Sequence, residues 1–185
     1  MKAILLAAGN SSRFGKNKLL EKVQGKFLYE YVLSIVQALE WEEIILVTQY
    51  EEIWNQLEGK GITLVKNEKP EKGIAFSIGL GMKAAGSQAD VMFFVCDQPY
   101  LKKESVIGMR EMFMSQPEGI VCAGSKKRTG NPNIFSAAFY DELMSLEGDK
   151  GGKRLIKAHP EQVRYYRVEE KELKDMDYRE DLCDF

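Results

Sequence analysis

The sequence has little histidine, little cysteine and no long hydrophobic run. Its single histidine, His159, excludes a metal site built from several histidines and most Ser–His or Cys–His catalytic machinery. The three cysteines are odd in number and form no CxxC pair, which favours a reducing compartment, and we expect a cytoplasmic protein. No segment approaches the roughly 18–20 apolar residues of a transmembrane helix, so we expect no membrane association.

Charge of either sign is not in large excess. The chain has 26 Lys and Arg against 28 Asp and Glu, a formal net charge of −2. This balance argues against a broad nucleic-acid surface, and we expect no nucleic-acid partner. It leaves room for a small anionic ligand, which needs only a few local cations and backbone amides. The 185 residues suit one domain, 1–185.

Short apolar runs alternate with segments of helical periodicity from end to end. The first four runs are continuous, as expected for parallel strands covered on both faces. Alternation of this kind predicts an α/β fold with a parallel or mixed sheet and helices on both sides. The expected strands are 3–7, 44–48, 62–66, 91–96, 120–123 and 163–168, and the expected helices are 27–39, 53–57, 74–85, 105–114, 137–146 and 153–158.

A glycine-containing loop follows the first expected strand. Residues 5–18 read LLAAGNSSRFGKNK, changing abruptly from apolar to small, polar and cationic. Gly9 and Gly15 permit positive φ, so that consecutive amides can point into one anion-binding concavity, and Arg13, Lys16 and Lys18 can neutralise a polyphosphate. The spacing matches neither the Walker A loop nor the GxGxxG dinucleotide pattern. The structural alternative is a solvated turn with basic residues.

This loop resembles the LAAGxSxRxGxxK signature of the molybdenum cofactor cytidylyltransferases, within the larger MobA-like nucleotidyltransferase group. The resemblance implies a Rossmann-like three-layer αβα sandwich, similar to the nucleotide-diphospho-sugar transferases. It implies that Arg13 contacts the triphosphate and Lys18 the α-phosphate region. The nucleotide-binding residues expected from it are Leu6, Ala7, Ala8, Gly9, Arg13, Lys18, Gly73 and Ser77.

The segment 73–81, GIAFSIGLG, is similar to the family's GxGxSLxxG nucleotide-contact element, with Ala75 in place of a glycine. Glycine and serine at the start of a helix offer unpaired amides and a hydroxyl to a ribose or base edge. The competing interpretation is an ordinary helix cap, followed by close packing on the sheet through Gly79 and Gly81.

Two carboxylates complete the predicted catalytic set. Asp97 ends an apolar strand, where a charge is costly unless it is paired or bound to a metal, although Asp97 could instead cap the next helix. The family's D-x-P element is matched there, and the resemblance implies that Asp97 ligates Mg²⁺. The segment 175–182, DMDYREDL, is similar to the family's DIDTPEDL, which implies that Asp177 supplies the second metal carboxylate. The catalytic residues expected are Arg13, Lys18 and Asp97.

Two further glycine-rich segments resemble acceptor-binding elements of the family. Gly130, Asn131 and Pro132 match its G-x-P segment, and Gly148, Asp149 and Lys150 lie in a stretch similar to its GD-x-GA element. We expect both to be loops before helices that bind a second anionic ligand. The basic run 126–128, taken alone, indicates a solvated hairpin turn.

The reaction implied is transfer of CMP from CTP to molybdopterin, a phosphorylated pterin acceptor, with release of pyrophosphate and subsequent transfer of the product to a molybdenum hydroxylase. An acceptor phosphate is already ionised and needs no general base, which agrees with the shortage of histidine. Mg²⁺, Lys18 and Arg13 would supply charge neutralisation. The alternatives are GTP, a sugar or polyol phosphate acceptor, or a non-catalytic protein that delivers the cofactor.

Overall fold

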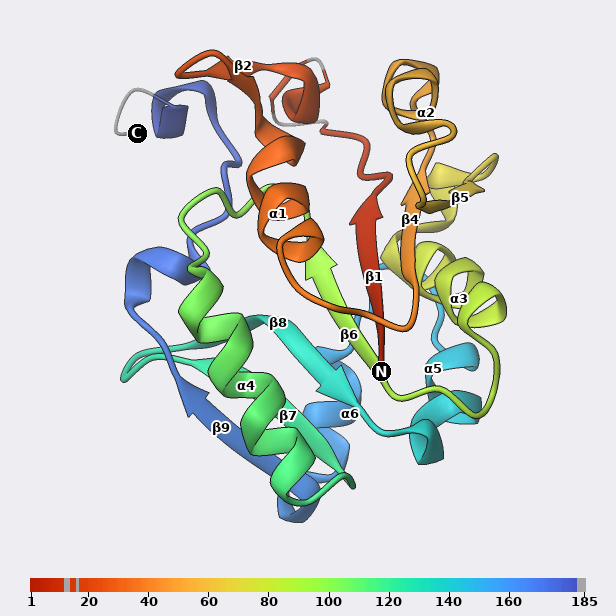
Figure 1. Cartoon of the computed structure of the whole chain (residues 1–185), viewed down its shortest axis with the longest axis vertical. Coiled ribbons are helices and arrows are strands. Elements are labelled where there is room, and N and C mark those ends of the chain that lie inside the picture. The colour runs from red at the N-terminus through yellow and green to blue at the C-terminus, as the bar shows by residue number, and fades with distance from the viewer. Residues whose placement is uncertain (12–13, 16, 183–185) are drawn as a thin grey trace.

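A twisted seven-stranded sheet forms the centre of the molecule (Figure 1). The computed structural model describes residues 1–11, 14–15 and 17–182. The strand order is β5-β4-β1-β6-β8-β7-β9. The strands are β1 (Lys2–Ala7), β4 (Ile44–Thr48), β5 (Thr63–Lys66), β6 (Val91–Val95), β7 (Ile120–Gly124), β8 (Thr129–Phe135) and β9 (Val163–Arg167).

Six of these strands share one direction. β1 pairs in parallel with β4 and β6, β4 with β5, and β7 with β9. Only β8 runs against its neighbours β6 and β7. Because the chain passes from β1 to β4 on one side and later to β6 on the other, the strand order reverses between β1 and β6. This is the place where open α/β sheets bind their ligands.

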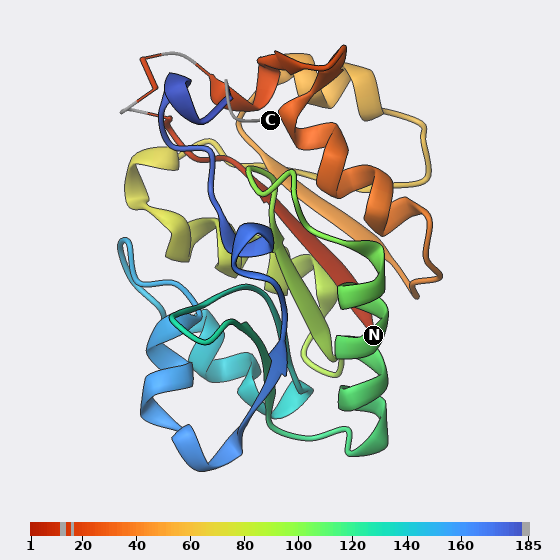
Figure 2. The ribbon, with the colours of Figure 1, turned by 90° about the vertical axis from the view of Figure 1, so that its left-hand side faces the viewer.

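Helices cover both faces of the sheet, which gives the predicted three-layer α/β architecture (Figure 2). One apolar core packs against α1 (Leu28–Gln37), α2 (Glu51–Leu57) and α4 (Lys103–Ser115). The core on the opposite face packs against α3 (Ile74–Ala85), α5 (Tyr140–Met144) and α6 (Lys153–Ala158). Successive side chains of β1 point to opposite faces of the sheet, since Leu5 belongs to the first core and Ile4 to the second.

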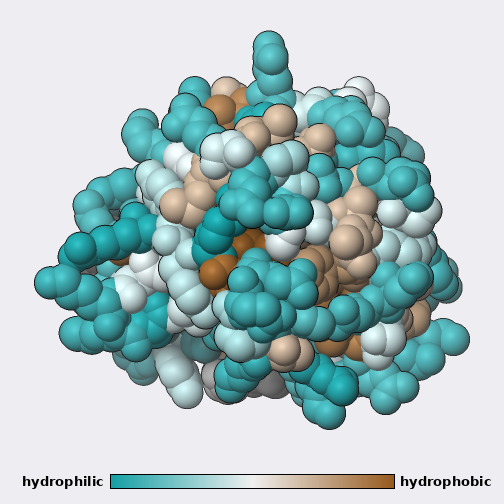
Figure 3. All heavy atoms as spheres, turned by 90° about the horizontal axis from the view of Figure 1, so that it is seen from below, coloured by the Kyte–Doolittle hydropathy of each residue, from teal (hydrophilic) through white to brown (hydrophobic). Residues whose placement is uncertain are grey.

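Short elements complete the chain. The strands β2 (Lys22–Val23) and β3 (Lys26–Phe27) form a small antiparallel hairpin. The 3₁₀ turns are η1 (Lys18–Leu20), η2 (Pro70–Lys72), η3 (Ala137–Phe139), η4 (Pro160–Gln162), η5 (Glu170–Leu173) and η6 (Arg179–Leu182). Among the described residues, no helix combines the length and the apolar character needed to cross a bilayer. The face shown in Figure 3 is covered mainly by hydrophilic residues, with apolar residues visible in patches between them.

All six expected strands are present, but the sequence analysis missed β8. We expected Gly130, Asn131 and Pro132 in a loop before a helix, and this was wrong: they lie within β8. The strand is hard to recognise because glycine, proline and asparagine are disfavoured in strands. The pairing with β7 is also irregular, passing from Cys122↔Asn133 to Ala123↔Gly130. The hairpin turn expected at 126–128 is confirmed between β7 and β8.

Candidate functional site

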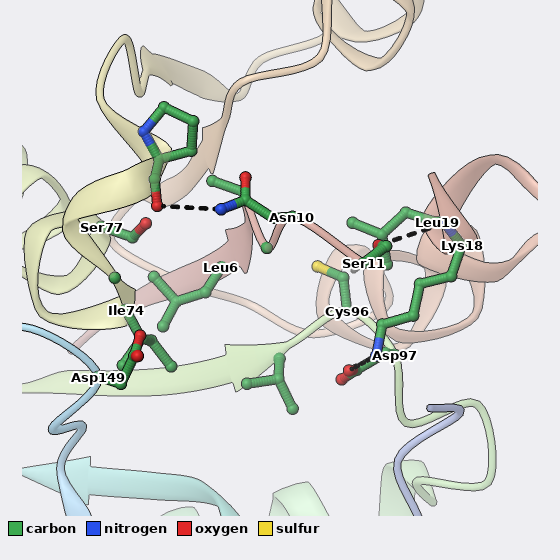
Figure 4. Close-up of a pocket in the computed structure, with 15 residues that line it drawn as sticks. Leu6, Asn10, Ser11, Lys18, Leu19, Ile74, Ser77, Cys96, Asp97 and Asp149 are labelled. Carbon is green, nitrogen blue, oxygen red and sulfur yellow. Dashed lines mark hydrogen bonds and ion pairs between the residues drawn. The ribbon is translucent and has the colours of Figure 1, made fainter. Parts of the chain in front are cut away.

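A cavity of about 370 Å³ opens where β1 and β6 end (Figure 4). It lies at the switch point of the sheet and is lined by the loop after β1, the end of β6 and the start of α3. Its lining residues are Leu6, Ala8, Gly9, Asn10, Ser11, Lys18, Leu19, Pro70, Gly73, Ile74, Ser77, Val95, Cys96, Asp97 and Asp149.

The β4–α2 connection fixes the course of the loop after β1. Thr48 Oγ1 donates a hydrogen bond to the Ala7 carbonyl at 3.0 Å, and Gln49 Nε2 donates to the Ala8 carbonyl at 3.0 Å. The Tyr50 hydroxyl donates to the carbonyl of Gly9. In a trans peptide the N–H points opposite to the C=O. The amides that follow these three carbonyls therefore point away from β4, as an anion-binding loop requires.

Lys18 bridges two carboxylates at the cavity wall. Its Nζ lies 2.7 Å from Asp97 Oδ2 and 3.0 Å from Asp177 Oδ1, and its side chain is only 12% exposed. Burial disfavours the charged ammonium, but the two carboxylates outweigh burial and raise the pKa of Lys18 above its ordinary value. Lys18 is consequently a fixed positive charge. Its backbone N–H also donates to Ser11 Oγ at 3.3 Å, which ties the lysine to the loop.

The C-terminal segment contributes a further carboxylate near Asp97, that of Asp175. Asp175 Oδ1 accepts a hydrogen bond of 2.8 Å from the side chain of Gln98, which is 2% exposed. Partial desolvation of its carboxyl group by the neighbouring segments, together with the nearby Asp97, raises the pKa of Asp175 above its ordinary value. In the sequence, Asp175 stands out only as part of the DMDYREDL motif, and no pattern distinguishes Gln98. Neither role was readable without knowing that the two segments meet.

The carboxylates fit a divalent cation. Asp97 Oδ1 is buried and has no hydrogen-bond partner among the described residues, although its Oδ2 is paired with Lys18. Within that part of the chain, no group of three or more His, Cys, Asp or Glu side chains is placed to hold a metal. Mg²⁺ requires fewer protein ligands, since it commonly binds through one or two carboxylates together with substrate phosphates and water. Asp97 and Asp177 meet that requirement.

Gly73 brings the start of α3 against the Gly148–Asp149 loop. The Ala75 N–H donates to the Gly148 carbonyl at 3.0 Å, and a Cβ on Gly73, whose φ is +80°, would lie 2.5 Å from that oxygen. Ser77 lines the cavity and accepts a hydrogen bond of 3.0 Å from Asn67 Nδ2. Glycine at 73 is thus required by both φ and contact. The competing interpretation, close packing on the sheet, holds for Gly81, where an added Cβ would meet Ile4, but not for Gly79, where it would meet nothing within 4 Å.

A second cavity of about 590 Å³ lies beside the first and shares Leu6, Ile74 and Asp149 with it. Of the expected acceptor residues, Asn131, Asp149 and Lys150 line this cavity. A Cβ on Gly130 would lie 3.3 Å from Leu173, a residue of the core on the opposite face of the sheet. The cavity is also lined by Asn133 and by three cationic residues of α6, Lys153, Arg154 and Lys157. The sequence analysis missed these four.

The remaining residues considered in the sequence analysis are two loop cations, the cysteines and the histidine. Arg13 and Lys16 lie outside the described residues, as does Cys183. Cys96 and Cys122 are buried core residues, and burial raises the pKa of the Cys122 thiol to about 11. His159 ends α6, where its Nε2 lies 2.8 Å from Glu142 Oε2, and it lines neither cavity.

The MobA-like NTP transferase domain family matches residues 3–163, most of the chain. The chain belongs to this family. Among its relatives is a probable molybdenum cofactor guanylyltransferase of Thermococcus sibiricus, 32% identical over 162 residues that cover 85% of this chain and 80% of the relative. The purine catabolism protein PucB of Bacillus subtilis is 26% identical, with 84% and 80% covered. This MobA-like chain is therefore a nucleotidyltransferase by family.

Solved structures show the same fold. Rv0371c of Mycobacterium tuberculosis superposes with a TM-score of 0.86 at 22% identity, covering all of this chain and 96% of that one. A second structure of Rv0371c, described as a complex with manganese, gives a TM-score of 0.75 at 20% identity, with 90% and 87% covered.

Proposed function

We propose that this MobA-like nucleotidyltransferase transfers CMP from CTP to molybdopterin and releases pyrophosphate. The observation that carries the proposal is the placement of Lys18, which lines the switch-point cavity, between the carboxylates of Asp97 and Asp177. A fixed cation and two carboxylates facing a loop of small residues suit a triphosphate and its divalent cation. The dinucleotide product would pass to a molybdenum hydroxylase.

The reaction is an in-line displacement at phosphorus. An oxygen of the acceptor's terminal phosphate forms a bond to the α-phosphorus of the NTP, and the bond from that phosphorus to the bridging α–β oxygen breaks. Pyrophosphate leaves with the bonding electrons. The attacking phosphate is already ionised at neutral pH, so no side chain has to remove a proton. The protein has to hold the two substrates in line and to balance their negative charge.

Lys18 is positioned for this charge balance. Its ammonium would approach the α-phosphate, where negative charge shifts as the bonds exchange. The residues that would hold Mg²⁺ are Asp97 and Asp177, and the ion would neutralise phosphate charge and orient the triphosphate. The unpartnered Asp97 Oδ1 supports this assignment, as does the manganese described for Rv0371c. Arg13, predicted from the motif to bind the triphosphate, remains part of the proposal.

The proposal also specifies which nucleotide base the protein uses and where the two substrates bind. CTP follows from the LAAG-type loop, whereas GTP is the second candidate because two relatives are described as probable guanylyltransferases. We assign the nucleotide to the first cavity, with Leu6, Gly73 and Ser77 beside it, and the acceptor to the second cavity. The two cavities adjoin at Leu6, Ile74 and Asp149, so that the nucleotide and the acceptor can bind side by side.

One assay tests the proposal. The protein is incubated with Mg²⁺, molybdopterin and each of the four NTPs in turn, and pyrophosphate is measured, with reactions lacking molybdopterin as controls. We expect acceptor-dependent pyrophosphate release, fastest with CTP. Faster release with GTP would replace cytidylyl by guanylyl transfer. Binding of both ligands with no release from any NTP would contradict the proposed reaction.

A further inference from the structure

Asn133 is a polar residue on an otherwise apolar stretch of the sheet. It lies in β8, opposite Phe93 of β6 and Cys122 of β7, and is 3% exposed. Its neighbours Phe93, Cys122 and Phe135 all belong to the core that packs against α3, α5 and α6. A side chain whose only task was packing would be apolar here, because a buried amide is costly unless its hydrogen bonds are made.

One half of this amide has no partner. Asn133 Nδ2 donates a hydrogen bond of 2.9 Å to Asn131 Oδ1. Asn133 Oδ1 is buried and has no hydrogen-bond partner among the described residues. Leaving such an acceptor unpaired destabilises the folded protein, because no hydrogen bond offsets the loss of its contact with water. Because Asn133 lines the second cavity, a ligand in that cavity can supply the missing donor.

The rest of the cavity defines what else the ligand carries. Apolar side chains form one part of the lining, and Phe93 and Phe135 meet edge to face there, with ring centroids 6.0 Å apart. Four cations form another part of it: Lys150, Lys153, Arg154 and Lys157. Within the described part of the chain, none of these four forms an ion pair with a carboxylate.

We infer that the second cavity binds a flat nitrogen heterocycle bearing an anionic group, and that Asn133 selects it by accepting a hydrogen bond from a ring N–H or amino group. The apolar side chains contact the faces of the ring, and the cations at the start of α6 hold the anion. This inference rests on the proposed function, since it describes the acceptor of that reaction. It adds that Asn133 decides which acceptors fit.

Two matched probes test this role by calorimetry. Pterin-6-carboxylate is flat, anionic and rich in N–H donors, whereas naphthalene-2-carboxylate is flat and anionic without N–H. We expect the wild-type protein to bind the pterin about tenfold more tightly, the effect of one hydrogen bond to a buried acceptor. Asn133→Leu should abolish this preference and leave naphthalene-2-carboxylate binding unchanged or improved. Arg154→Gln should weaken both probes equally, since it removes only positive charge.

Asn133→Ala serves as a second variant if the leucine is not accommodated, and thermal melting checks that each variant is folded. Equal binding of the two probes by the wild type would overturn the inference, as would an unchanged preference in a folded Asn133 variant. NTP binding and pyrophosphate release are measured on the same preparations. If the wild type shows transfer activity but the Asn133 variants keep the wild-type preference between the probes, only the role of Asn133 is refuted. Absence of NTP binding would refute the proposed function, while the probe ratio still decides the role of Asn133.

Discussion

The backbone N–H of Met176 donates a hydrogen bond of 3.0 Å to the carbonyl oxygen of Asp97. This bond joins the C-terminal segment to the chain immediately after β6. Met176 is fully buried in the core that packs against α1, α2 and α4, which anchors the segment. Asp177 is held in turn, because its N–H donates to Asp181 Oδ2 at 3.0 Å. Two acidic residues far apart in the sequence thereby reach the same lysine.

The first prediction concerns the metal carboxylate. Asp97→Asn should fold normally, since Lys18 keeps its contact with Asp177, but Mg²⁺-dependent turnover should fall by about 100-fold or more because one anionic ligand becomes neutral. The measurement is pyrophosphate release against Mg²⁺ concentration. The matched control is Asp141→Asn, an exposed aspartate on α5, which should retain wild-type activity. Full activity in folded Asp97→Asn would remove the metal assignment.

The second prediction separates an enzyme from a carrier. Lys18→Ala should lower kcat by roughly 10²–10³-fold, the range found when one preorganised electrostatic donor is removed. NTP affinity, measured by calorimetry, should change much less, because the loop amides and the metal carboxylates remain. Lys22→Ala, which removes an exposed lysine of β2, is the control and should change neither quantity.

A carrier would behave differently at Lys18. The substitution would then alter cofactor affinity and hydroxylase activation in proportion, with no pyrophosphate made by the wild type or the variant. That result would exclude the enzymatic role of Lys18.

The third prediction addresses the base. CTP should raise the melting temperature more than ATP, GTP or UTP, and only with Mg²⁺ present, because Asp97 and Asp177 repel a triphosphate without its metal. A ligand at 100 times its Kd stabilises the folded state by about 2.7 kcal/mol, which thermal melting resolves. Equal shifts from all four nucleotides would contradict the choice of CTP without affecting nucleotide binding.

The fourth prediction uses two glycines with the same backbone strain. Gly73 and Gly86 have φ of +80° and +85°, so alanine at either position should cost about 1–3 kcal/mol of unfolding free energy. Only at Gly73 would the new Cβ also lie 2.5 Å from the Gly148 carbonyl, whereas at Gly86 it meets nothing within 4 Å. In urea unfolding, Gly73→Ala should be the more destabilised variant. It should also lose nucleotide affinity, which Gly86→Ala retains; equal behaviour of the two would show that the contact does not matter.

The sequence by itself determined the layered α/β fold, because continuous apolar strands and amphipathic helices report burial locally. The sequence pattern also drew attention to the loop cations and to Asp97, because a charge at the end of an apolar strand is unusual, and the family resemblance selected Lys18 among those cations. Only the tertiary structure decided that Asp177 meets Lys18, because that contact depends on the segment buried through Met176.

The same holds for β8 and Asn133. No local preference favours a strand through glycine, proline and two asparagines, and β8 exists because β6 and β7 present unpaired edges on both of its sides. Whether the Asn133 oxygen is satisfied depends on which side chains surround it, and residues distant in the sequence supply them. Local patterning therefore determines most of the elements, whereas β8 and the unpaired Asn133 oxygen follow only from the tertiary arrangement.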